Sequence, residues 1–106
     1  MERITLNKPL LVNGQEMNEL TLDFDLITTQ DFMQASGEAT ASVVQCGGVT
    51  LGTEFDPAFH LALAFRAVVH GTKGVSLMDA KRIGGRDLLV LQRAGRNFCL
   101  GGLSAD

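Results

Sequence analysis

The sequence predicts an α+β fold in which an N-terminal β-hairpin packs on about three helices. Alternating apolar residues on both sides of Asn13-Gly14 indicate the hairpin, because an Asn-Gly turn matches the twist of paired strands. An almost wholly apolar segment from Pro57 to His70 indicates a central helix. Since 106 residues fit one domain, we expect residues 1–106 to form a single unit.

We expect residues 1–25 to form the hairpin. Ile4 and Leu6 alternate with polar residues before the turn, and a Leu-Thr-Leu pattern follows it. A period of two places one face of each strand on the core and the other in water. Pro9 has no backbone donor, so the first strand is predicted to be an edge strand with a bulge.

The helical part is expected over residues 28–100. Thr28 supplies a hydroxyl cap with Asp31 three residues later, close to a capping box. Gly37 weakens this first helix by about 1 kcal/mol relative to Ala. A Gly-rich loop is predicted over residues 46–53. The predicted apolar face comprises Phe32, Ala35, Ser36, Ala39 and Val43.

The second helix is predicted from Pro57, with Asp56 as its cap and Gly71 after its last turn. Its apolar side chains cover almost the whole circumference. A helix of this kind is buried either at the centre of its own domain or against a partner.

A short turn over residues 76–83 and the pair Gly84-Gly85 precede the last predicted helix. Asp87 is expected to cap that helix by accepting from free backbone N–H groups. We expect the helix to end at Gly101-Gly102 and residues 101–106 to form a frayed tail. Its predicted apolar face comprises Leu88, Leu91, Ala94, Gly95 and Phe98.

Composition and charge exclude several classes of protein. A hydrophobic content of 45% with a net charge of −3 excludes disorder over the whole chain. Phe is the sole aromatic type, and with a negative net charge this disfavours nucleic-acid binding. No apolar run reaches the roughly 20 residues of a membrane span, and the start lacks a secretory pattern, so we expect a cytoplasmic protein. Cys46 and Cys99 are expected to be buried thiols.

No catalytic or metal-binding motif is complete. Gly47 and Gly52 have the spacing of a phosphate loop, but Thr53 stands where that loop requires Lys. His60 and His70 lie about 15 Å apart along one helix and cannot share a metal ion. We therefore expect a protein that is not an enzyme and that binds no cofactor and no metal. A small enzyme or ligand-binding domain remains as an alternative, ranked below the two non-enzymatic functions given at the end of this subsection. The acidic cluster is interpreted as a solvated face and comprises Asp23, Asp25 and Asp31.

One candidate partner surface lies on the second helix. At 100° per residue, four side chains fall within a stripe of about 60°; two of the four are polar, and the rest of the circumference is almost wholly apolar. We expect this stripe to reach the surface and to contact a partner or a second copy of the chain. The open alternative is that the hairpin or the 46–55 loop covers its apolar members. The stripe comprises Phe59, Leu63, Arg66 and His70.

A second candidate surface is basic. Residues 1–64 carry nine acids against two bases, whereas residues 65–106 carry seven bases against three acids. Arg86, Arg93 and Arg96 lie opposite the apolar face of the last helix, with Lys81 and Arg82 nearby. This basic face is interpreted as a docking surface for an acidic partner or for the acidic half of a second copy, or as a solvated helix surface.

Short motifs at both ends carry a family resemblance. The segment Ile4-Thr5-Leu6-Asn7-Lys8-Pro9-Leu10-Leu11-Val12-Asn13-Gly14 is followed by Met17-Asn18-Glu19-Leu20-Thr21-Leu22, then by Thr28-Thr29-Gln30-Asp31-Phe32. Near the end, Asp87-Leu88-Leu89 opens a helix that closes on Asn97-Phe98. Together these segments resemble the tail assembly chaperones of contractile-tailed bacteriophages. The resemblance covers little of residues 37–78.

The resemblance implies a non-enzymatic role in phage tail assembly. Such chaperones bind the long tape measure protein, keep its apolar helices soluble and help to recruit tail tube subunits. They are absent from the finished particle, so the resemblance implies a protein of the bacterial cytoplasm. A structural phage protein, such as a tail-completion or head–tail connector subunit, is the alternative.

Overall fold

The N-terminal hairpin forms as the alternation predicts. The computed structural model describes residues 2–46 and 57–103, beginning with β1 (Glu2–Val12) and the antiparallel β2 (Gln15–Leu22). Asn13 and Gly14 between them have φ angles of 51° and 82°. Positive φ at both central residues defines the turn that Asn-Gly favours, so the predicted turn is confirmed.

The predicted bulge in the first strand is also confirmed. Thr5 pairs with Glu19 and Leu10 pairs with Met17, so the register shifts across the part of β1 that contains Pro9. Paired positions stop at Thr5 and resume at Leu10, so the ladder with β2 is interrupted over residues 6–9. Every buried side chain of β1 belongs to the main core, and these are Ile4, Leu6, Leu10 and Val12.

Replacing Gly14 with Val is expected to destabilise the domain by more than about 1 kcal/mol. A Cβ at this position would meet no atom within 4 Å, so the whole cost comes from the positive φ. The melting temperature measures it. An unchanged melting temperature would contradict the left-handed turn at this position.

The first helix, α1 (Thr29–Cys46), follows the 3₁₀ turn η1 (Phe24–Leu26). Its capping box is confirmed, because the Thr28 hydroxyl accepts from the N–H of Asp31 at 3.1 Å while the Thr28 N–H donates to the Asp31 carboxylate at 3.0 Å. Ala35 and Ala39 are buried, but Phe32 is 46% exposed, so the predicted apolar face is only partly correct. Val43 lies beyond the described side chains, and the predicted loop after Cys46 lies outside the described residues.

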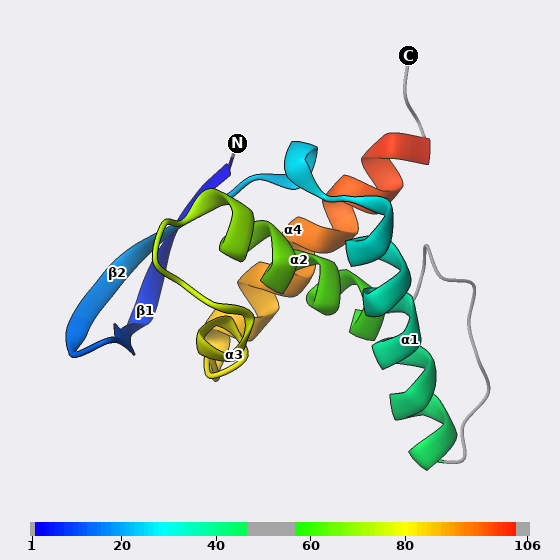
Figure 1. Ribbon diagram of the computed structural model, residues 1–106, viewed down its shortest axis with the longest axis horizontal. Helices are drawn as coiled ribbons and strands as arrows, with labels where there is room; N and C mark the ends of the chain where they lie inside the picture. The colour runs from blue at the N-terminus through cyan, green and yellow to red at the C-terminus, as the bar shows by residue number, and fades with distance from the viewer. Residues whose placement is uncertain (1, 47–56, 104–106) are drawn as a thin grey trace.

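The second helix, α2 (Pro57–Gly71), lies at the centre of the fold, as its apolar circumference predicts. Figure 1 shows it between α1 and the hairpin, with α4 (Arg86–Leu103) alongside. The predicted start at Pro57 and end near Gly71 are confirmed, while the predicted cap Asp56 lies outside the described residues. The helix is therefore buried inside its own domain rather than against a partner.

The predicted turn before the last helix contains the single-turn helix α3 (Leu77–Ala80), which Ser76 and Asp79 cap reciprocally. The helix after it, α4, runs through Gly101-Gly102 to Leu103, so the predicted end at this glycine pair is wrong. Gly101 lacks the positive φ of a helix-ending cap, which among the described glycines occurs at Gly14, Gly74 and Gly85. Residues 104–106 lie outside the described residues.

Asp87 does not cap α4 as predicted. The helix already begins at Arg86, and the buried Asp87 carboxylate accepts hydrogen bonds from the backbone N–H groups of Asn7 at 2.9 Å and Lys8 at 3.1 Å. Both donors belong to the bulge of β1, where the strand partner is missing. Asp87 thus attaches the last helix to the first strand. With its N-terminal hairpin packed on helices, the protein has the predicted α+β fold.

Candidate helix-docking surfaces

The predicted exposure of the α2 stripe is wrong. Phe59, Leu63 and Arg66 are only 1%, 0% and 3% exposed, and His70 alone of the four lies at the surface. The prediction used Arg66 as a marker of solvent, but a buried guanidinium is stable where an acid from another element meets it. The apolar pair is therefore part of the core and is not open to a partner in this conformation.

Helix α1 covers the stripe at all four positions. The Phe32 ring stands edge-on to Phe59, with 4.9 Å between ring centroids. Leu63 lies in a cluster of buried apolar side chains that α1 completes with Ala35 and Ala39. The described cover is thus α1 and not the hairpin, while residues 47–55 of the loop that the sequence offered as the other alternative lie outside the described residues.

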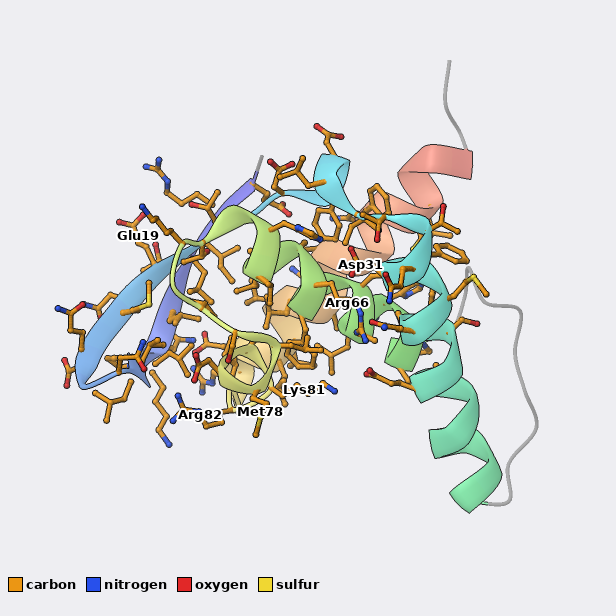
Figure 2. The ribbon with its side chains drawn as sticks, viewed as in Figure 1. Glu19, Asp31, Arg66, Met78, Lys81 and Arg82 are labelled. Carbon is orange, nitrogen blue, oxygen red and sulfur yellow. The ribbon has the colours of Figure 1, made fainter. Side chains whose placement is uncertain are left out.

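An ion-pair network joins α1 to the buried Arg66. One terminal nitrogen of Arg66 donates to the Glu38 carboxylate at 2.6 Å, and the other donates to the Ala62 carbonyl oxygen at 3.0 Å. The Lys81 ammonium lies 3.3 Å from the second Glu38 oxygen. Figure 2 shows Arg66 between α1 and α2, with Lys81 below it. Burial raises the pKa of Glu38, but its hydrogen bonds and its attraction to Arg66 and Lys81 outweigh burial and lower that pKa overall.

The second polar contact of the stripe is between His70 and Asp31. The Nε2 atom of His70 lies 2.7 Å from the Asp31 carboxylate, which also completes the capping box of α1. Burial raises the pKa of Asp31, but the hydrogen bonds from His70 and Thr28 outweigh it, so the pKa lies below its ordinary value. One carboxylate therefore fixes both the start of α1 and its contact with the end of α2.

Acid is expected to weaken the α1–α2 contact through Asp31. Because its pKa is lowered on folding, its contribution to stability is present above the unfolded pKa of about 4 and is lost as the pH falls through the folded-state pKa. Asp31→Asn should lower the melting temperature at pH 7 and flatten its decline in acid. Asp25→Asn, at an exposed position, is the control. An acid decline as steep in Asp31→Asn as in wild type would contradict this role.

The outer face of α4 carries the predicted basic residues on an exposed surface. Arg86, Arg93 and Arg96 are all exposed, and two aliphatic side chains stand between the first two, Leu89 at 66% and Val90 at 41% exposure. Residues three and four apart are neighbours on a helix, so these five form one continuous surface, here called the α4 face. The sequence interpretation missed its aliphatic members, although their spacing from the arginines was readable.

The two other cations of the predicted basic face are engaged elsewhere. Lys81 pairs with Glu38, and Arg82 binds the Asp79 carboxylate at 2.8 Å and the Leu11 carbonyl oxygen at 2.6 Å. A cavity of about 290 Å³ opens between the β1 bulge and the start of α4, and Lys8, Arg82 and Arg86 line part of it. The basic surface thus continues from the α4 face toward β1.

Within the described residues, no group of three or more His, Cys, Asp or Glu side chains is placed to hold a metal ion, and no helix is long and apolar enough to cross a membrane. Cys99 is half-buried rather than fully buried, beside the cluster that contains Phe59. The side chain of Cys46 is not described.

Comparison with known proteins gives no relative for this chain: no family model, no curated protein and no solved structure matches it.

Proposed function

We propose that this protein is a non-enzymatic phage tail assembly chaperone, which binds the tape measure protein in the host cytoplasm and helps to recruit tail tube subunits. The observation that carries the proposal is the α4 face, where exposed aliphatic side chains stand among three arginines. The segments that resemble the chaperone family form the hairpin, the start of α1 and most of α4. The Asp87 carboxylate joins α4 to the hairpin by accepting hydrogen bonds from the backbone N–H groups of Asn7 and Lys8.

The chemistry of the α4 face fits an amphipathic helix that has acidic residues beside its apolar side. Leu89 and Val90 offer apolar contact to such a helix, and the arginines offer bidentate hydrogen bonds to its carboxylates. Arginine and large apolar residues are the types that concentrate binding energy at protein interfaces, and complementary charge accelerates association. A tape measure protein is long, helical and prone to aggregate, so its chaperone needs apolar surface that accepts a helix face.

The α4 face replaces the α2 stripe as the proposed contact. Phe59, Leu63 and Arg66 lie beneath α1, whereas the side chains of the α4 face are open to solvent. Further large exposed apolar side chains lie on β1, η1, α1, α3 and α4, where they can extend a contact with a long partner. They are Leu11, Leu26, Phe32, Met33, Met78 and Phe98.

Coexpression with the tape measure protein encoded beside this chain tests the proposal. Wild type should raise the soluble yield of the tape measure protein and copurify with it. The triple variant Arg86→Glu, Arg93→Glu, Arg96→Glu should reduce copurification at least tenfold, because it turns attraction to acids into repulsion. Arg3→Glu combined with Lys73→Glu, two exposed cations off α4, is the charge-reversal control and should still bind.

The outcomes separate the surface from the function. If wild type and the triple variant copurify equally well with the tape measure protein, the α4 face is excluded as the contact surface, and the proposed chaperone role stands. Failure of wild type to copurify with the tape measure protein, or to raise its solubility, would overturn the proposed function.

A further inference from the structure

We propose that the α2 stripe is a helix-binding site that α1 occupies in the free protein, and that a partner helix with two acidic residues seven positions apart displaces α1 from it. The natural partner helix would belong to the tape measure protein, and this identity rests on the proposed function. The exchange of helices is a property of this chain and can be tested without a phage protein.

Among the side chains that the structure describes on α1, those of residues 29–39, the contact with α2 buries small residues. Its fully buried contributions are the small side chains Ala35 and Ala39, while Phe32 is half-exposed and Met33 is 67% exposed. On the α2 side, by contrast, the large side chains of Phe59 and Leu63 are completely covered. In the described part of α1, the contact thus sets two small side chains of α1 against two large ones of α2, so a competing helix matches the stripe when it carries small residues at these positions.

The polar contacts specify what a competing helix must carry. Asp31 and Glu38 are seven residues apart, two turns of helix, so both point from one side of α1. They meet His70 at 2.7 Å and Arg66 at 2.6 Å. A competing helix therefore needs two acids at this spacing with small residues between them. The Nε atom of Arg66 is buried without a hydrogen-bond partner in the described part of the chain, so α1 does not saturate this cation.

The main core does not depend on α1. The larger apolar cluster draws on β1, β2, α2, α3 and α4 and includes no buried side chain of α1. In the smaller cluster the described buried side chains come from α1 and α2, with Ile27 and Cys99 of α4 packed against them; the buried members are Ala35, Ala39, Phe59, Ala62 and Leu63. Figure 1 shows α1 along the side of the molecule away from the hairpin. Release of α1 therefore opens the stripe while the hairpin, α2 and α4 keep their packing.

The covalent connection makes α1 a strong competitor. A tethered segment competes at an effective concentration in the millimolar range, so a free helix displaces it only when a second contact holds that helix nearby. The α4 face supplies such a contact under the proposed function. A partner helix held at the α4 face would then displace α1 and bind the α2 stripe. An apolar helix that lacks the two acids and binds α4 weakly would not displace α1.

The test uses the full chain and a fluorescein-labelled peptide of residues 28–45 as the competing helix. In the variant Asp31→Asn, Glu38→Gln, the tethered α1 loses both charged contacts while α2 stays unchanged. Fluorescence anisotropy should show the peptide binding this variant at least tenfold more tightly than wild type. A peptide with the same two acids neutralised is the matched control and should show no such gain. Glu38→Gln alone repeats the comparison if the double variant does not fold.

Hydrogen exchange gives the second measurement. Peptide binding should accelerate exchange of the amides of α1 and leave those of β1, β2 and α4 protected. A folded variant that does not bind the peptide, or a peptide that binds without deprotecting α1, would overturn the inference. Because no tape measure protein is present, these outcomes are independent of the coexpression test of the proposed function.

Discussion

The double variant Phe59→Ser, Leu63→Ser is expected to lose the packing of α1 on α2 and to destabilise the domain by several kcal/mol. Both side chains are almost completely buried beneath α1. Loss of a buried Phe or Leu costs about 2–5 kcal/mol each, and the introduced hydroxyls add the cost of burying polar groups. Small domains are stable by only about 5–15 kcal/mol in total. Far-ultraviolet circular dichroism and thermal melting measure the result.

Met33→Ser combined with Met78→Ser is the control for this variant. Both methionines are large apolar side chains at exposed positions, on α1 and α3. Their loss should change the free energy of unfolding by about 0.5 kcal/mol or less for each site. A folded Phe59→Ser, Leu63→Ser variant with the melting temperature of wild type would contradict the packing of α1 on α2.

Gly95→Ala is expected to destabilise the domain, although it places a better helix former inside α4. A Cβ at Gly95 would overlap the carbonyl oxygen of His60 and lie 2.7 Å from its carbonyl carbon, so α2 and α4 would have to separate. Overpacking of this kind costs about 1–3 kcal/mol, which exceeds the gain of up to about 1 kcal/mol in helix propensity. Urea unfolding gives the sign and the size.

Gly37→Ala is the matched control, because a Cβ at this position of α1 would meet no atom within 4 Å. No steric overlap opposes the gain in helix propensity, so the variant should be more stable than wild type by up to about 1 kcal/mol. Equal stabilisation by both changes would contradict the close backbone approach between α2 and α4.

The predictable parts of the fold are those that local residues decide. Asn13-Gly14 is a turn signal complete within two residues, and Thr28 with Asp31 is a cap complete within four. The apolar circumference of α2 predicts central burial without knowledge of its neighbours. Each of these features could be read from the sequence, because no distant contact competes with it.

The failures arise where a distant residue competes with a local one. Asp87 looks like a cap, but the bulge of β1 presents two backbone N–H groups from 80 and 79 positions away and takes its carboxylate. Arg66 looks like a solvent marker, but Glu38 reaches it from 28 positions away. Helical periodicity gives the angle between side chains on one helix and contains no information on which element covers them.

The candidate surfaces were predictable to different degrees for the same reason. The arginines of the α4 face are exposed as expected because a charged side chain without a partner stays in water. The grouping of the α2 stripe was readable and corresponds to one contact surface, since α1 meets all four of its members. That α1 covers the stripe could not be predicted from α2, because the acids that pair with Arg66 and His70 belong to α1.

Mass spectrometry of phage particles tests the central claim, that this protein is an assembly factor and not a component of the finished tail. The chain should be abundant in lysates of cells that are assembling phage and absent from particles purified from them, with a tail tube protein as the internal reference. Stoichiometric copies of the chain in purified mature particles would contradict the claim and support a structural tail or connector subunit instead.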